Sequence, residues 1–207
     1  MIYGDFRRFV MQLINQYSAR GTQLLENYND QADYFVRIPG LYNACMLEMA
    51  TEAAPLVSIL EYSEDEVTRA HGFVLVPQPA DFLRMSEDGL PMMVCGKMTR
   101  VKGYWTAGDQ IAIREDLYDH AILEYYRAPK RLTAESEEDT KLDGTIEMQT
   151  AAAYYVAAML CMQDDAFVYA ALRNEYDDRL SSMKKRLRAE NFFVVDQMNT
   201  GFDPYMS

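Results

Sequence analysis

The sequence predicts an α+β fold: a mainly α-helical bundle with a small antiparallel β-sheet insertion and an extended C-terminal arm. Apolar residues recur at three- and four-residue spacing toward both ends of the chain, which is typical of amphipathic helices. The middle of the chain instead has short apolar runs separated by turn residues, which is typical of antiparallel strands. The last twenty residues are apolar but contain Gly201 and Pro204, so we expect an arm that docks on another surface.

These patterns divide the 207-residue chain, of which 49% is hydrophobic, into a few parts. We expect residues 1–55 and 144–188 to form the helical bundle and residues 56–132 to form the β insertion. Residues 133–143 are the expected acidic linker, because TAESEEDTK has no apolar anchor that could offset the entropy lost on ordering. Residues 189–207 are the expected C-terminal docking arm.

The first fifty residues predict three helical pieces. Asp5 is the expected cap of the first helix, and Asp30 is the expected cap of a short second one. Pro39 is the expected first residue of a third piece, and Pro55 follows its end. Because a proline ring disfavours helical geometry at the preceding residue, the sequence predicts a kink or break at Ile38.

Six short apolar runs in the middle of the chain are candidate strands. They are LVSIL, FVLV, MMVC, VKGYW, QIAI and AILEYY, and glycines separate them. We expect them to form a small sheet inserted between the helical segments.

Two further helices are predicted after the acidic linker. Thr145 is the expected cap of IEMQTAAAYYVAAMLCM, which is apolar nearly all round and therefore the expected central helix. Asp164 is the expected cap of the next helix. The basic cluster of Lys184, Lys185, Arg186 and Arg188 is expected at the end of that helix, where positive charge complements the helix dipole.

Charge and composition exclude some classes of function. The formal net charge of -12 makes the surface as a whole repel nucleic acid and anionic lipid, although a local basic patch stays possible. Cys45, Cys95 and Cys161 are odd in number and far apart, as is typical of reduced cysteines in a protein core. No apolar run approaches the roughly 20 residues that span a bilayer, so we expect the protein to remain where it is made.

Residues that could carry chemistry are sparse. His71 and His120 have no second histidine or cysteine at metal-ligand spacing, and no nucleophile motif or phosphate-binding glycine motif occurs. The acidic pairs Asp164-Asp165 and Asp177-Asp178 are interpreted as a helix start and a solvated face. The sequence therefore predicts no enzyme, no catalytic residue, no metal site and no cofactor.

Four segments, in order, resemble the head-tail adaptor (connector or head-completion) proteins of tailed bacteriophages. They are a helical N-terminal segment, VLVPQPADFLRM before a short-stranded sheet, ILEYYRAPKRL with an acidic spacer, and AAAYYVAAMLCMQDDAFVYAALRNEYDDRL. The match covers roughly residues 3 to 187. The chain has an extra Pro77-Gln78 before the usual proline-containing step, and the motifs are packing patterns without catalytic residues.

The resemblance implies a virion structural protein at the neck, made in the host cytoplasm. Its implied partners are the portal protein, neighbouring adaptor subunits in a ring expected to be dodecameric, and tail or neck proteins. DNA would pass through the ring without specific binding, and no membrane is involved. The expected portal-binding residues of the arm are Phe192, Phe193, Val194, Val195, Phe202 and Tyr205.

Two other classes of function stay open. A tail-completion protein or assembly chaperone would remain a monomer or small oligomer and leave finished particles. An enzyme of unrecognised type would have a deep polar pocket with titratable groups whose pKa values are shifted by burial.

Overall fold

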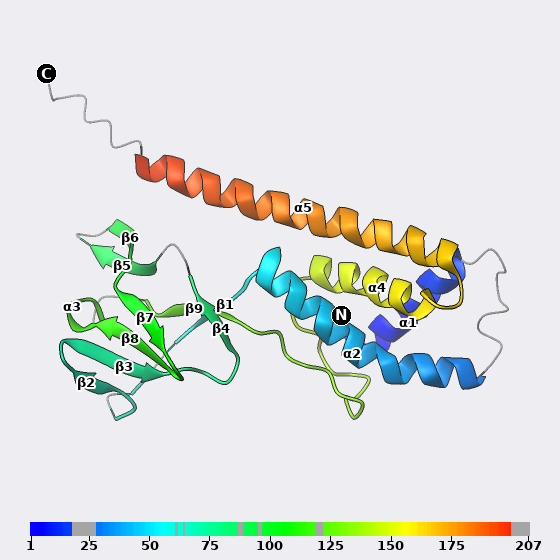
Figure 1. Ribbon diagram of the computed structural model, residues 1–207, viewed down its shortest axis with the longest axis horizontal. Helices are drawn as coiled ribbons and strands as arrows, with labels where there is room; N and C mark the ends of the chain where they lie inside the picture. The colour runs from blue at the N-terminus through cyan, green and yellow to red at the C-terminus, as the bar shows by residue number, and fades with distance from the viewer. Residues whose placement is uncertain are drawn as a thin grey trace, which may run out of the picture. The chain divides into compact units, whose positions relative to one another are not determined.

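The chain divides into two compact units in a computed structural model. The helical unit comprises Met1–Ala54 and Pro129–Ser207, and the β unit is Pro55–Ala128 (Figure 1). The structure describes residues 1–17, 28–60, 62–63, 65–86, 89–94, 97–118 and 122–199. Within those ranges the side chains of residues 28–32, 93–94 and 188–199 fall outside the description.

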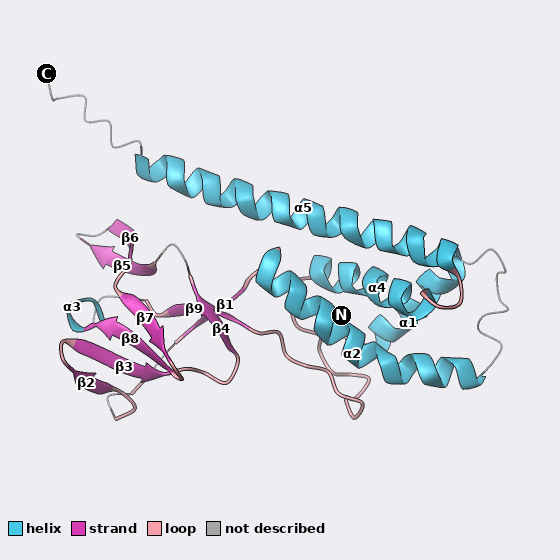
Figure 2. Ribbon diagram, in the orientation of Figure 1, coloured by secondary structure: helices cyan, strands magenta, loops and turns pink. Residues whose placement is uncertain are grey.

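The predicted class, a mainly helical bundle with a small sheet, is wrong. The described ranges hold five helices and nine strands, and the strands form three antiparallel sheets, so the chain is α+β without a dominant bundle (Figure 2). The candidate runs missed three strands. Two of them, TRA and FLRM, contain charged residues and therefore are not apolar runs. The third was merged with its neighbour, because the run VKGYW spans the end of one strand and the start of the next, with a turn at Lys102-Gly103.

Helix α4, Ile146–Cys161, is the central helix of the helical unit, as its composition predicts. It contacts α1 (Tyr3–Tyr17), α2 (Tyr28–Glu52) and α5 (Ala166–Asn199). Ten of its sixteen residues are buried, and alanines predominate among them, so neighbouring helices pack closely against it. Thr145 caps α4 as predicted, because its hydroxyl accepts a hydrogen bond from the backbone N–H of Met148 at 3.2 Å.

Helix α2 is continuous through Pro39, so the predicted break at Ile38 is wrong. A proline inside a helix removes one backbone hydrogen bond. Ile38 and Pro39 are both buried, as are Tyr42 and Met46 farther along the helix. Packing of this face therefore keeps the segment helical where local geometry disfavours it.

The starts of two helices differ from the prediction, by three residues for α1 and by one residue for α5. Helix α1 begins at Tyr3, so Asp5 lies in its first turn and is not its cap. Helix α5 is capped by Asp165 and not by Asp164, because the Asp165 carboxylate accepts hydrogen bonds from the backbone N–H groups of Phe167 and Val168. A carboxylate at these positions still meets the positive end of the helix dipole.

Helix α5 also extends farther than predicted. It runs through Asn199, so residues 189–199 are helical and not an extended arm. The basic cluster consequently lies inside the helix and not at its end. Two of its charges have partners on other helices: Lys184 pairs with Glu52 at 2.6 Å, and Arg186 pairs with Glu147.

The β unit contains all three sheets. The first has the order β1-β9-β4 and the second β2-β3-β8-β7, while β5 and β6 form a hairpin. The strands are β1 (Leu56–Ile59), β2 (Thr68–Ala70), β3 (Phe73–Pro77), β4 (Phe82–Met85), β5 (Leu90–Val94), β6 (Lys97–Val101), β7 (Tyr104–Ala107), β8 (Gln110–Arg114) and β9 (Glu124–Arg127). A short helix, α3 (Glu115–Tyr118), follows β8.

One hydrophobic core contains residues from all three sheets. Val74, Val76, Ile111 and Ile113 come from paired strands β3 and β8 and are fully buried. Tyr125 on β9 and the other members of the cluster pack with them: Leu60, Met85, Leu90 and Leu123. Along β3 fully buried side chains alternate with less buried ones, so one face of this strand is turned to the core.

Candidate functional site

The structure does not place the predicted portal-binding side chains. Phe192, Phe193, Val194 and Val195 lie in α5, but their side chains are outside the description. Phe202 and Tyr205 lie outside the described residues altogether. The role of all six residues stays a prediction.

Where the structure describes them, the residues considered for chemistry do not gather into one site. His71 is exposed in the turn between β2 and β3, where it and Gly72 both have positive φ (53° and 80°), as a tight hairpin turn requires. Cys45 and Cys161 are buried free thiols, and burial raises the pKa of each to about 12. His120 and Cys95 lie outside the described residues.

No group of three or more metal-ligating side chains that could hold an ion is found in the described part of the chain. Asp164 accepts a hydrogen bond from the Tyr34 hydroxyl at 2.9 Å, and Asp165 caps α5. Asp177 pairs with Arg173 one turn earlier in the same helix. None of the described helices is long and apolar enough to cross a membrane.

A partly buried polar cluster links two helices of the helical unit, α2 and α5. The Tyr176 hydroxyl on α5 donates to the Glu48 carboxylate on α2 at 3.1 Å, and Tyr176 also hydrogen-bonds Cys45. Burial raises the pKa of Tyr176, and the nearby Cys45 and Glu48 raise it further. The Arg173 guanidinium lies 5.0 Å from the Tyr176 ring centre. This cluster has the character of a structural network, because its groups are satisfied by one another.

The two β segments of the phage resemblance meet in the structure. VLVPQPADFLRM ends in β4, ILEYYRAPKRL contains β9, and the two strands pair antiparallel. The Tyr125 hydroxyl donates to the Asp81 carboxylate at 2.7 Å, and the Tyr125 and Phe82 rings stack with centres 5.9 Å apart. Arg84 lies over the Tyr126 ring at 5.0 Å. Both motifs thus build one sheet.

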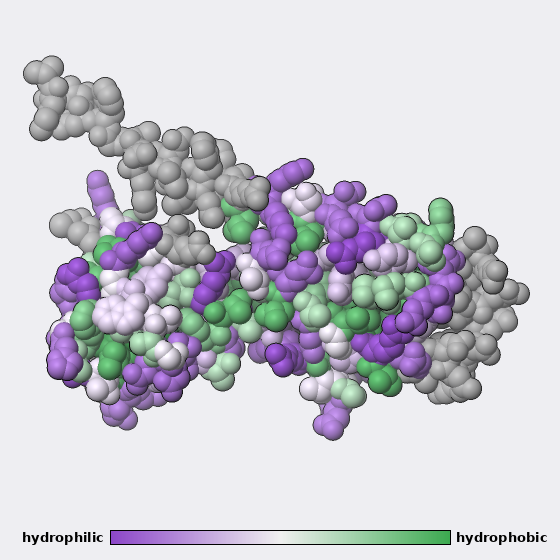
Figure 3. Space-filling view, in the orientation of Figure 1, coloured by the Kyte–Doolittle hydropathy of each residue, from purple (hydrophilic) through white to green (hydrophobic). Residues whose placement is uncertain are grey.

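Large apolar side chains are exposed on both units. On β1, an edge strand, Val57 is 56% and Ile59 60% exposed, and the two point to the same face. In the helical unit Val36, Ile146 and Phe167 are even more exposed. Hydrophobic residues interrupt the polar surface of both units on the face in Figure 3. Exposed apolar edges of this kind favour contact with another chain.

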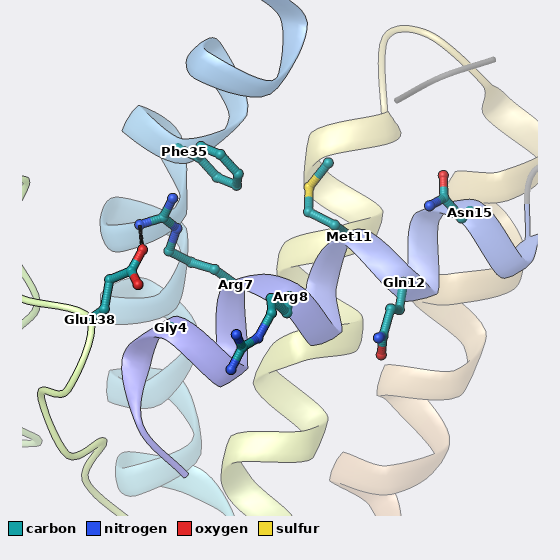
Figure 4. Close-up of a pocket in the computed structure, with 8 residues that line it drawn as sticks. All are labelled: Gly4, Arg7, Arg8, Met11, Gln12, Asn15, Phe35 and Glu138. Atoms are coloured by element: carbon teal, nitrogen blue, oxygen red, sulfur yellow. Dashed lines mark hydrogen bonds and ion pairs between the residues drawn. The ribbon is translucent and has the colours of Figure 1, made fainter. Parts of the chain in front are cut away.

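A cavity of about 340 Å³ lies along α1. Helix α1 supplies most of its wall, Phe35 comes from α2, and Glu138 comes from the acidic segment 133–143 (Figure 4). The lining residues are Gly4, Arg7, Arg8, Met11, Gln12, Asn15, Phe35 and Glu138. We call this the α1 cavity.

The acidic segment reaches the α1 cavity because its backbone pairs with the start of the chain. Gly4 N–H donates to the Glu138 carbonyl at 2.8 Å, and Tyr3 N–H donates to the Thr140 carbonyl at 2.9 Å. A β-bridge joins Ile2 and Lys141. A Cβ on Gly4 would lie 3.1 Å from the Glu138 Cβ, so the close approach favours glycine here. Segment 133–143, which the sequence predicts to be a linker, therefore forms part of the wall of the α1 cavity.

Arg7 is the central cation of the α1 cavity. Its guanidinium lies 4.0 Å from the Phe35 ring centre and 5.6 Å from the Tyr3 ring centre. One terminal nitrogen, Nη1, is 3.4 Å from a Glu138 carboxylate oxygen, and Figure 4 shows the guanidinium between Phe35 and Glu138. The Glu138 side chain is 76% exposed, so water weakens this ion pair.

The cavity wall also holds two buried polar atoms without a hydrogen-bond partner among the described residues. They are Nε of Arg7, a donor, and Oδ1 of Asn15, an acceptor. Each atom has almost no exposed surface, so it lies within the wall and does not face the open space of the cavity.

Sequence reasoning missed the α1 cavity. The helical pattern of α1 drew attention to its apolar face, whereas the cavity is lined by polar residues next to that face. The available signal was Arg7, Arg8, Gln12 and Asn15, which follow one another at one- to four-residue spacing. Their neighbours Phe35 and Glu138 are distant in sequence, so only the fold brings them together.

Comparison with models of known protein families gives no match. Comparison with curated proteins gives no match either.

Proposed function

We propose that this chain is a virion structural protein of a tailed bacteriophage, a head-tail adaptor. It forms a ring on the portal, links the capsid to the tail and lines the channel through which DNA passes. It acts at the neck of the virion and is made in the host cytoplasm. The proposal assigns it no enzymatic activity and no cofactor.

The pairing of β4 with β9 is the observation that carries this proposal most directly. The two strands come from separate segments of the adaptor resemblance, and Tyr125 joins them through Asp81 and Phe82. The residues that carry the resemblance are thus bonded to one another and form part of one core. The last of the four segments, which spans α4 and α5, forms the most extensive helix contact of the helical unit.

The exposed surface is also suited to assembly. A closed ring needs two different faces on each subunit that complement one another. The exposed Val57 and Ile59 on an edge strand provide an apolar strip in the β unit, and Val36 and Phe167 provide apolar contacts in the helical unit. The net charge of -12 suits a channel that must not bind phosphates tightly.

Mass photometry of the chain alone and mixed with a candidate portal ring tests the proposal. The full-length chain is compared with a chain ending at Asn199 and with one ending at Ala189. We expect the full-length chain to add a complete ring to the portal. The chain ending at Ala189, which lacks all six predicted contact residues, should fail to add.

The chain ending at Asn199 divides the predicted contact residues, because it keeps Phe192 to Val195 and lacks Phe202 and Tyr205. Ring addition by this chain assigns portal contact to the helical part. Circular dichroism of each variant verifies that the helical unit is folded. Failure of the full-length chain to associate with the portal, at low and at moderate salt, contradicts the adaptor proposal and favours an assembly chaperone or an enzyme.

A further inference from the structure

We infer that α2 contains a hinge at Pro39, about which the N-terminal part of the helix opens as a flap while the rest stays packed. The flap is the segment Tyr28–Ile38. Its opening uncovers the surfaces of α1 and α4 that it contacts in the closed form. This inference does not depend on the adaptor proposal, because it follows from contacts within the helical unit.

Pro39 weakens α2 at the point where the flap joins the rest of the helix. Proline has no N–H, so the Phe35 carbonyl four residues earlier does not receive its helical hydrogen bond, and the proline ring crowds that carbonyl. When the flap is open, Pro39 is the first residue of the remaining helix, a position that proline favours because no N–H is needed there. Pro39 therefore opposes the closed form of α2 and suits the open one.

Little apolar surface holds the flap closed. Among its described side chains only Tyr34 and Ile38 are buried. The part of α2 after Pro39 has more buried side chains, which are Tyr42, Cys45, Met46, Met49 and Ala50. The α1 cavity adjoins the flap, since Phe35 forms part of its wall, so packing between the flap and α1 is incomplete there. The flap should therefore open at a lower cost than the rest of the helix.

Two hydrogen bonds latch the flap to the neighbouring helices. The Tyr34 hydroxyl donates to the Asp164 carboxylate at 2.9 Å, in the connection between α4 and α5. The Arg37 guanidinium donates to the Met159 carbonyl on α4 at 3.5 Å, which is a long bond. Tyr34 thus makes the shorter of the two bonds, and neither bond involves the part of α2 after Pro39.

The rest of α2 has anchors of its own. The Asn43 side chain forms two hydrogen bonds with Leu132, and the Glu48 carboxylate accepts a hydrogen bond from Tyr176 on α5. These contacts do not involve the flap. Two separate sets of contacts consequently hold the two parts of α2, and Pro39 lies between them.

Native-state hydrogen exchange of the full-length chain tests the inference. The amides of Val36, Arg37 and Ile38 report the flap, and those of Cys45 and Met46 report the rest of the helix. We expect the flap amides to exchange at least about a hundredfold faster after correction for intrinsic rates, and to share one opening equilibrium constant. A gradual decrease of exchange along α2, with no step at Pro39, is typical of ordinary fraying and overturns the inference.

Two neighbouring substitutions test the role of Pro39. Pro39→Ala supplies the missing N–H, so the flap amides should exchange at least about tenfold more slowly. Gly40→Ala is the matched control. Because Gly40 is helical whether the flap is open or closed, the flap amides of this variant should stay within about twofold of the wild type. If the two variants behave alike, Pro39 is not a hinge and the inference is wrong.

A second pair of variants tests the latch. Tyr34→Phe removes the hydrogen bond to the Asp164 carboxylate, so the flap amides should exchange about tenfold faster. Tyr42→Phe, the same change after Pro39, should leave them within about twofold of the wild type. Circular dichroism verifies that each variant is folded. If Pro39→Ala does not fold, the Tyr34→Phe variant decides alone, and unchanged exchange of its flap amides overturns the inference.

Discussion

Replacement of Asn43 by alanine should loosen the segment that carries Glu138. The Asn43 amide on α2 donates to the Leu132 carbonyl at 2.7 Å and accepts from the Leu132 N–H at 2.8 Å. Leu132 is only 5% exposed, so water replaces these two bonds poorly. A hydrogen bond contributes about 0.5–1.5 kcal/mol net, and the better helix propensity of alanine offsets about 0.5 kcal/mol. Two such bonds less this offset give about 1.5 kcal/mol, which is the amount by which we expect Asn43→Ala to lower the free energy of unfolding.

Two measurements check this magnitude. A loss of about 1.5 kcal/mol corresponds to a thermal midpoint lower by about 3–6 °C for a chain of this size. Hydrogen exchange of the Leu132 amide reports the local effect, and it should become at least about tenfold faster because the N–H loses its acceptor. Asn174→Ala, the same change at an exposed site on α5, is the control and should stay within about 0.5 kcal/mol. Unchanged protection of the Leu132 amide in Asn43→Ala would refute the reasoning.

Three further predictions concern the cap, a glycine and the thiols. Thr145→Ala removes the hydroxyl that caps α4 and should cost about 1 kcal/mol, read from chemical denaturation; no loss would mean that the Met148 N–H finds another acceptor. Gly89 has φ +103°, and a Cβ there would lie 2.7 Å from the Val101 carbonyl oxygen, so Gly89→Ala should destabilise the β unit by more than about 2 kcal/mol. Gly40→Ala, on α2 where nothing lies within 4 Å, should instead stabilise the helical unit by about 0.5–1 kcal/mol, and similar effects of both changes would refute the steric argument. Burial raises the pKa of Cys45 and Cys161 from 9.0 to about 12, so the unfolded chain loses these protons at lower pH than the folded chain does. The contribution of the two buried thiols to the free energy of unfolding is therefore full below pH 9. Between pH 9 and pH 12 it falls by about 1.4 kcal/mol per pH unit for each thiol. Urea denaturation between pH 8 and 11 measures this slope, and Cys45→Ala should reduce the slope by the contribution of one thiol. A free energy of unfolding that does not change with pH in this range would contradict the burial of both thiols.

The sequence predicts well those elements whose local signal agrees with the tertiary contacts. Thr145 and the uniformly apolar run after it identify α4 and its central place, because both the cap and the burial are encoded locally. Runs of apolar residues likewise predict β1, β3, β5, β8 and β9. The two buried thiols also lie where their apolar neighbours indicate.

The failures come from contacts between residues far apart in sequence. Pro39 signals a break, yet the buried face on either side of it keeps α2 continuous. Strand β4 contains Arg84 and was missed, because its pairing with β9 depends on Tyr125 and Tyr126 forty residues later. The α1 cavity was missed for the same reason, since Phe35 and Glu138 have no local pattern that links them to Arg7.

The division of the chain has a consequence for the order in which its parts fold. The β unit is one continuous stretch, Pro55–Ala128, whereas the helical unit is made of two stretches that flank it. During synthesis the β unit can therefore fold as soon as it leaves the ribosome, because all of its pairing partners are present. Helices α1 and α2 must wait for α4, whose alanine-rich surface completes their core. Until α4 has emerged, the apolar faces of α1 and α2 are open to water. A chaperone or a neighbouring nascent chain can bind these faces during that interval.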